Sequence, residues 1–125
     1  MQEMRLLLVD DESEFLTLVT RRMARRGVLV TTAESGRQAL DLLEHGTFDA
    51  VVLDVRMPGM DGIETLRRLK ERFPDLAVIL LTGHADTASA FTGMELGAFD
   101  YMIKPVAFDE LFAKIRDAAR CSTRN

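Results

Sequence analysis

Acidic side chains follow two short apolar segments of this chain, at the points where the segments end. Asp10 and Asp11 come directly after residues 5–9, and Asp54 comes directly after residues 50–53. Carboxylates that gather in one place repel one another, and a hard divalent cation such as Mg²⁺ relieves that repulsion. An aspartate oxygen can also attack phosphorus and form an acyl phosphate. The acids therefore predict Mg²⁺-dependent phosphoryl chemistry, provided that the fold brings the two groups together.

A hydroxyl and an ammonium group end two further apolar segments. Thr82 follows residues 76–81, and Lys104 follows residues 100–103. Phosphoryl transfer is promoted mainly by positioning and by neutralising charge on the phosphoryl oxygens, and these two groups can supply both. Each feature also has a structural explanation, because acids favour the start of a helix and a lysine can simply extend into water. Four such features at the ends of four segments favour a functional site.

Apolar segments alternate with amphipathic ones along the chain. The apolar segments predict strands at residues 5–9, 28–32, 50–53, 76–81 and 100–103. The amphipathic segments predict a helix with Ser13 as its N-cap that stops at Gly27, a helix from Gly36 to Gly46, a helix from Ile63 that breaks at Pro74, a helix from Asp86 to Leu96, and a last helix from Phe108. This alternation predicts an α/β fold, a flavodoxin-like (βα)5 doubly wound parallel sheet with strand order 2-1-3-4-5.

The predicted strand order would gather the polar residues at one edge. The first and third strands are neighbours at the topological switch point, which places Asp10 and Asp11 beside Asp54. The fourth and fifth strands bring Thr82 and Lys104 to the same edge. We therefore expect one site at the carboxyl ends of the strands.

Composition excludes several classes of protein. With 125 residues, 47% of them apolar, the chain is expected to form one domain, residues 1–125. No apolar run is long enough for a membrane span or a signal peptide. A net charge of −4 argues against direct nucleic-acid binding by this segment. Cys121 is the only cysteine, so no internal disulfide is possible and a cytoplasmic location is expected.

Four short motifs stand in a characteristic order. They are VDDE at 9–12, LDVRMPGMDG at 53–62, LTGHAD at 81–86 and YMIKP at 101–105. With them, the chain resembles the receiver domain of two-component response regulators over essentially its whole length. The resemblance implies signal transduction through an aspartyl phosphate.

Residue roles follow from the resemblance. Asp54 would accept the phosphoryl group from the phosphohistidine of a histidine kinase or a histidine phosphotransfer protein. Thr82 and Tyr101 would form the conformational switch, and Lys104, in a cis peptide bond with Pro105, would pair with the phosphoryl group. The Mg²⁺ ligands implied are Asp10, Asp11, Asp54 and the backbone carbonyl of Arg56.

Three surface features invite hypotheses. The segment from Thr87 to Met94 is uncharged and rich in residues of low helix propensity, which favours a bistable helix. Together with the last strand and the last helix, this helix would form an output or homodimer surface. Arg56 and His84 would flank the phosphoryl group, and Arg56 would either shield it from water or simply extend into solvent. The first helix carries a basic cluster, either a solvated face or a kinase-steering surface, made of Arg21, Arg22, Arg25 and Arg26.

Other functions fit the residues less well. An Mg²⁺-dependent aspartyl phosphohydrolase usually has a second acid two residues after its nucleophile, where this chain has Arg56. A flavodoxin-like FMN carrier needs a phosphate-binding loop after its first strand, and the acids there would repel the FMN phosphate. A degenerate receiver that only binds other proteins is the remaining alternative. We expect no enzymatic activity beyond self-phosphorylation and autodephosphorylation.

Overall fold

The computed structural model describes residues 3–56, 61–83 and 86–122 as five strands and five helices in strict alternation. The strands are β1 (Met4–Val9), β2 (Val28–Ala33), β3 (Ala50–Asp54), β4 (Val78–Thr82) and β5 (Asp100–Ile103). The helices are α1 (Ser13–Arg25), α2 (Gly36–His45), α3 (Gly62–Arg72), α4 (Thr87–Glu95) and α5 (Phe108–Cys121). Within the described residues, no helix has the length and apolar content that a membrane span requires.

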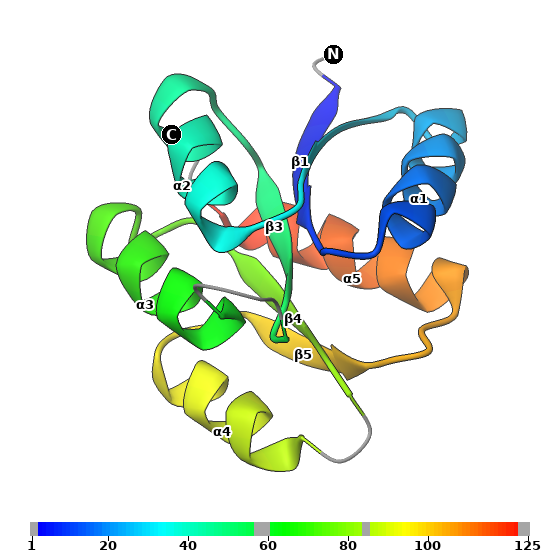
Figure 1. Cartoon of the computed structure of the whole chain (residues 1–125). Coiled ribbons are helices and arrows are strands. Elements are labelled where there is room, and N and C mark those ends of the chain that lie inside the picture. The colour runs from blue at the N-terminus through cyan, green and yellow to red at the C-terminus, as the bar shows by residue number, and fades with distance from the viewer. Residues whose placement is uncertain (1–2, 57–60, 84–85, 123–125) are drawn as a thin grey trace.

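All neighbouring strands are parallel, and the sheet order is β2-β1-β3-β4-β5. The predicted doubly wound fold and strand order are thereby confirmed. Helices α1 and α5 cover one face of the sheet, and α2, α3 and α4 cover the other (Figure 1). Because Val9 is in register with Leu53 and Thr82 with Ile103, the residues that follow these strands meet at one edge.

Successive side chains of a strand point to opposite faces, so the central strands divide their apolar residues between two cores. Leu6 and Leu8 of β1 pack in the core under α1 and α5, whereas Leu7 and Val9 pack in the core under α2 and α3. Strand β3 is buried on both faces, from Ala50 to Asp54. This double burial holds the strand ends, and with them the site residues, in fixed positions.

Helix α1 begins differently from the prediction. Ser13 is the first helical residue, and Glu12 is the N-cap, so the predicted N-cap at Ser13 is wrong by one position. The carboxylate of Asp10 accepts the Glu12 N–H at 2.9 Å, and the Glu12 carbonyl accepts the first helical N–H, from Leu16, at 3.1 Å. A turn made by Asp10 therefore sets the start of the helix, and no side-chain cap is formed.

Strand β4 begins later than the prediction, at Val78 instead of Leu76. The Leu76 N–H donates to the Phe73 carbonyl in a turn at 3.2 Å, and the Ala77 N–H donates to Ser122 Oγ at 2.9 Å. These two N–H groups are therefore used outside the ladder between strands.

Helix α4 has fewer buried residues than any other described helix. Its buried residues are Ala90 and Gly93, while the Phe91 side chain is 68% exposed. A methyl group on Gly93 would overlap Leu80 Cδ1, so the glycine allows the close approach to β4. The Asp86 carboxylate caps this helix by accepting the Ser89 N–H at 3.3 Å.

Candidate functional site

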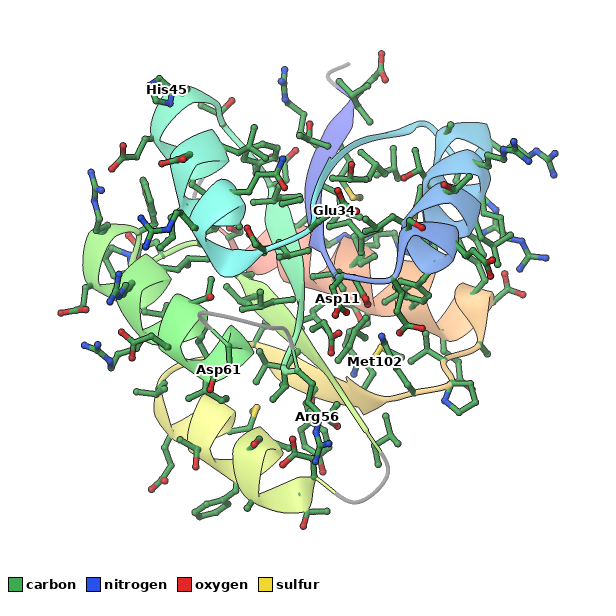
Figure 2. The ribbon with its side chains drawn as sticks, viewed as in Figure 1. Asp11, Glu34, His45, Arg56, Asp61 and Met102 are labelled. Carbon is green, nitrogen blue, oxygen red and sulfur yellow. The ribbon has the colours of Figure 1, made fainter. Side chains whose placement is uncertain are left out.

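Three carboxylates meet at the carboxyl edge of the sheet. Asp10 follows β1 and is fully buried, and Asp54 ends β3 with 6% of its surface exposed. One oxygen each from Asp10, Glu12 and Asp54 lies within 4.8 Å of the other two. Figure 2 shows that Asp11, from the same turn, lies near this edge, but its side chain is exposed and outside the group of three.

The sequence alone predicts no role for Glu12. It is the third acid after β1, and the turn closed by Asp10 directs it toward Lys104. Sequence alone shows three consecutive acids but not which of them faces the sheet edge, because that depends on the backbone of the turn. Asp11 still contributes its negative charge to the electrostatic field at Asp54.

Lys104 occupies the centre of the acidic group. Its Nζ donates to Asp10 Oδ2 at 2.7 Å and to Glu12 Oε1 at 2.8 Å, and lies 3.6 Å from Asp54 Oδ2. The ammonium also lies 4.8 Å from the centre of the Phe15 ring. Burial alone would lower the pKa of Lys104, but its bonds with Asp10 and Glu12 hold the pKa above the usual range. The lysine thus supplies a permanent positive charge among the carboxylates.

The surroundings of Asp54 disfavour the ionised form of its carboxyl group. Burial and the nearby Asp10 charge raise the pKa of Asp54 from 3.8 to about 6. Lys104 and the Arg56 N–H, which donates to Asp54 Oδ1 at 3.2 Å, act in the opposite direction. Near neutral pH Asp54 is therefore mainly ionised and would gain from an additional cation.

The acidic group fits a divalent cation of the Mg²⁺ type. Such ions prefer a few carboxylate or carbonyl oxygens together with water. The donor atoms of Asp10, Glu12 and Asp54 are carboxylate oxygens, and besides burial the charges of Asp10 and Asp11 raise the pKa of Asp54.

Thr82 and Tyr101 lie where the sequence predicts, at the end of β4 and in β5. Thr82 is buried, and its Oγ1 donates to the Met102 carbonyl at 3.5 Å, a long hydrogen bond. Tyr101 is 40% exposed. The Lys104–Pro105 peptide bond is cis, as the resemblance implied.

Arg56 points toward helix α4. Its Nε lies 3.6 Å from Asp86 Oδ2, and Figure 2 shows the side chain between the end of β3 and the start of α4. Hydrogen bonding from Ser89 and the Arg56 charge hold the pKa of Asp86 below its usual value, although burial opposes them. His84, the other residue expected to flank the phosphoryl group, lies outside the described residues.

A groove of about 420 Å³ between α1 and α5 adjoins the site. Glu12 and Lys104 line it together with apolar side chains that include Phe15 and Leu18. The predicted basic cluster borders this groove only in part. Arg22 stacks on Phe108 at 5.4 Å, and Arg26 stacks on Phe112 at 4.9 Å and pairs with Asp109 at 2.9 Å.

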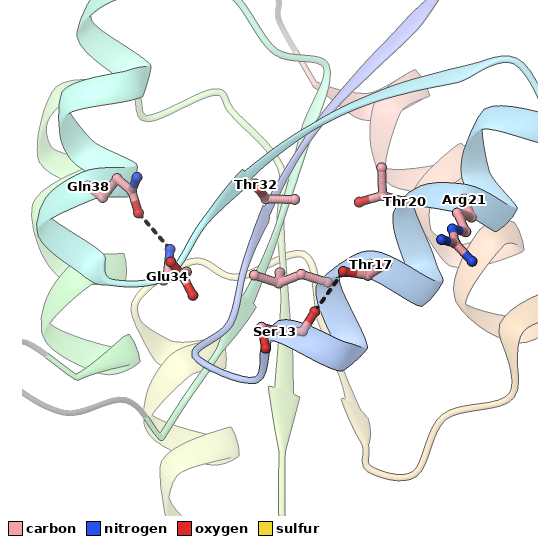
Figure 3. A pocket seen from close by; sticks show the side chains of 8 residues that line it. Ser13, Thr17, Thr20, Arg21, Thr32, Glu34 and Gln38 are labelled. Atoms are coloured by element: carbon pink, nitrogen blue, oxygen red, sulfur yellow. Dashed lines mark hydrogen bonds between the residues drawn. The ribbon is translucent and has the colours of Figure 1, made fainter.

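A second groove of about 420 Å³ lies between α1, β2 and α2 and is more polar (Figure 3). Thr20 and Thr32 face one another across it, with Glu34 and Gln38 on the far wall (Figure 3). The Thr20 hydroxyl is buried without a hydrogen-bond partner among the described residues. None of the three site carboxylates lines this groove.

Comparison with known proteins agrees with the geometry. The profile of the response regulator receiver domain family matches residues 6–116. The chain is 42% identical over 108 residues to the DNA-binding transcriptional regulator NtrC of Klebsiella pneumoniae, covering 86% of this chain and 23% of the relative. It is 40% identical over 119 residues to the response regulator MprA of Mycolicibacterium vanbaalenii, covering 95% of this chain and 52% of the relative. The chain thus spans about a quarter of the length of the first of these relatives and about half of the second.

Solved structures resemble this chain over nearly all of its length. A response regulator receiver domain protein from Clostridium thermocellum superposes with a TM-score of 0.89 at 35% identity, covering 94% of each chain. A CheY-like receiver domain protein from Methanospirillum hungatei gives a TM-score of 0.90 at 27% identity, covering 95% of each chain.

Proposed function

This chain belongs to the family of two-component response regulator receiver domains, and we propose that it is a phosphoaccepting receiver with Asp54 as the phosphorylated residue. The observation that carries the proposal is the position of Asp54, the buried carboxylate at the tip of β3 that shares Lys104 with Asp10 and Glu12. We propose that residues 1–125 make up one such domain, whose chemistry is limited to its own phosphorylation and dephosphorylation.

The proposed reaction is a direct transfer. A carboxylate oxygen of Asp54 attacks the phosphorus of a phosphohistidine, the new O–P bond forms, and the N–P bond breaks with the electron pair left on the imidazole, which takes up a proton. Asp54 must be ionised to attack, and a pKa of about 6 leaves most of it ionised at pH 7 or above. Two of its neighbours hold the carboxylate for this step: Lys104 at Oδ2 and the Arg56 N–H at Oδ1.

Mg²⁺ is the proposed cofactor, and when bound it would neutralise charge on the carboxylates and the phosphoryl oxygens. Asp10, Glu12 and Asp54 are the described carboxylates that would hold it. Asp11 and the Arg56 carbonyl remain proposed ligands from the resemblance. The proposed role of Lys104 after transfer is to pair its ammonium with the phosphoryl group, and it would be free to do so where Asp10 and Glu12 held the metal.

The proposed switch uses Thr82 and Tyr101. The Thr82 hydroxyl has only a long bond, 3.5 Å, to the Met102 carbonyl, which it can exchange for a phosphoryl oxygen. Tyr101 is 40% exposed and would turn inward into space that Thr82 leaves. The output or homodimer surface would then be the α4–β5–α5 face, where Phe91, Met94 and Ile103 are exposed apolar side chains.

A histidine kinase or histidine phosphotransfer protein is the proposed phosphodonor, and its encounter would take place in the cytoplasm. The groove between α1 and α5 is the proposed docking surface, because Lys104 lines it and Leu18 on its wall is 56% exposed. Arg22 is the member of the basic cluster that lines this groove. Arg21 and Arg25 have no ion-pair or aromatic partner among the described residues, so their charges remain available to attract an acidic partner.

Phosphorylation from a small-molecule donor tests the proposal. The protein is incubated with acetyl phosphate or phosphoramidate, with Mg²⁺ or with a chelator, and its intact mass is measured. We expect a metal-dependent gain of one phosphoryl group in the wild type and none in Asp54→Ala. No gain in the wild type would instead favour a degenerate receiver.

A further inference from the structure

Arg56 links the phosphorylation site to helix α4. Its backbone N–H donates to Asp54 Oδ1 at 3.2 Å, while its guanidinium Nε lies 3.6 Å from Asp86 Oδ2 (Figure 2). The arginine side chain is 76% exposed, so the Asp86 contact and not packing sets its direction. The same residue therefore contacts the phosphoacceptor with its backbone and the start of α4 with its side chain.

Asp86 uses its two oxygens for different partners. Oδ1 accepts the Ser89 N–H at 3.3 Å and so caps α4, and Oδ2 faces Arg56. Helix α4 has no acid in its first turn and no basic residue in its last turn, so no side-chain charge within the helix complements its dipole. We therefore expect α4 to depend on its cap more strongly than the other helices depend on theirs. A change at Arg56 is therefore felt directly at the first turn of α4.

We propose that Asp86 is a positioning residue for the Arg56 guanidinium. While Asp54 is unphosphorylated, Asp86 holds the guanidinium at the start of α4. After phosphorylation, Asp86 and the phosphoryl group compete for the guanidinium. This inference rests on the proposed function. A phosphoryl group carries a charge of about −1.5 to −2 and presents oxygens that suit the arginine fork. Because Arg56 follows Asp54 by two residues, the new charge appears within reach of the guanidinium. The ion pair between Arg56 and Asp86 is then weakened.

The competition has two consequences that can be measured. When the Arg56 guanidinium is paired with Asp86, it stabilises the first turn of α4 but leaves the acyl phosphate open to water. When the guanidinium is paired with the phosphoryl group, it shields the acyl phosphate, and α4 loses the ion pair at its first turn. An exposed pair of this kind shifts an equilibrium by about two- to fivefold, so the effects should be of that size.

Asp86→Asn separates the ion pair from the cap, because an asparagine oxygen still accepts the Ser89 N–H but carries no charge. It is compared with Arg56→Gln, the double variant and a matched control, Asp109→Asn, which removes an exposed acid paired with Arg26 away from the site. The half-life of the acyl phosphate is measured after removal of acetyl phosphate. Hydrogen exchange in residues 89–93 is measured on the unphosphorylated proteins.

We expect Asp86→Asn to lengthen the half-life about two- to fivefold when Arg56 is present and to leave it unchanged in the Arg56→Gln background. Either single variant should speed exchange in the first turn of α4 by a similar factor, with no further effect in the double variant. Asp109→Asn should change neither quantity. Should Asp86→Asn fail to fold, Asp86→Ser gives the same comparison, since serine also caps without charge.

An unchanged half-life in Asp86→Asn, or an equal change with and without Arg56, would overturn the inference. In those cases the wild type still gains its phosphoryl group, so the proposed function stands. If the wild type gains none, the proposed function fails and this inference fails with it. The two failures are therefore distinguishable in one experiment.

Discussion

The ionised Asp54 carboxylate destabilises the metal-free protein, and Asp54→Asn should therefore stabilise it at neutral pH. The side chain is 6% exposed, and burial together with the Asp10 charge raises its pKa from 3.8 to about 6. Lys104 offsets this only in part, from 3.6 Å. An asparagine has nearly the same shape, keeps an oxygen for the Arg56 N–H and carries no charge.

The sign and size follow from the difference in pKa between the folded and unfolded chain. Well below its unfolded pKa of 3.8, Asp54 is protonated in both states and contributes no difference. As the pH rises toward 6, the unfolded chain releases the proton first, so the wild type loses stability; above 6 the loss is constant. A difference of about two pKa units at 1.36 kcal/mol per unit gives a loss of up to about 3 kcal/mol. Because Asn removes one partner of Lys104, we expect a net gain of about 1–3 kcal/mol.

The assay is urea unfolding of wild type and Asp54→Asn between pH 4 and 8, in the presence of a chelator. The variant should have the higher free energy of unfolding at pH 8, and the two should converge near pH 4. Asp41→Asn, an exposed acid on α2, controls for the change in net charge. Added Mg²⁺ should stabilise the wild type more than the variant, because it relieves the same repulsion.

Two results would refute this reasoning. If Asp54→Asn is no more stable than the wild type at pH 8, the carboxylate is not under the electrostatic strain described here. If its advantage is the same at pH 4 as at pH 8, the gain has a cause other than ionisation.

Three further perturbations test other parts of the account. Gly62→Ala should lower the free energy of unfolding by about 1–3 kcal/mol, because the new methyl group would overlap the Asp54 carbonyl. The control Gly46→Ala places its methyl group at ordinary contact distances. In the same urea assay it should change the free energy of unfolding by less than about 0.5 kcal/mol. Lys104→Ala should raise the pKa of Asp54 further, measurable by carboxyl NMR titration, and slow phosphorylation by acetyl phosphate by on the order of a hundredfold; an unchanged rate would remove Lys104 from the mechanism. Phe91→Ser should leave stability within about 0.5 kcal/mol but weaken any phosphorylation-dependent self-association in analytical ultracentrifugation, and equal self-association would exclude this exposed side chain from the interface.

The fold was predictable because its signals are local and repeated. Short apolar runs that end in polar residues, such as 50–53 before Asp54, define buried parallel strands, and helical spacing defines the segments between them. Once the strand order follows from the alternation, the positions of Asp10, Asp54, Thr82 and Lys104 at one edge follow as well. The structure has each of them at the carboxyl end of its strand.

What the sequence did not reveal depends on backbone turns and on contacts between distant segments. Glu12 faces Lys104 because Asp10 closes a turn onto its N–H, and no spacing rule distinguishes it from Asp11. The side chain of Arg56 contacts Asp86, 30 positions later in the chain. Arg22 of α1 and Arg26, the residue that ends this helix, stack on Phe108, and this contact depends on how α1 and α5 pack. In each case the partner comes from tertiary structure.

The central claim is that Asp54 receives the phosphoryl group, and chemical trapping of the acyl phosphate tests it most directly. The protein is phosphorylated with acetyl phosphate and Mg²⁺, reduced with borohydride, and digested for peptide mass spectrometry. Reduction converts a phosphorylated aspartate into homoserine, so we expect homoserine at position 54, only in the sample that received the donor, and aspartate at positions 10 and 11. Homoserine at another position, or none in a protein that has gained a phosphoryl group, would contradict the account.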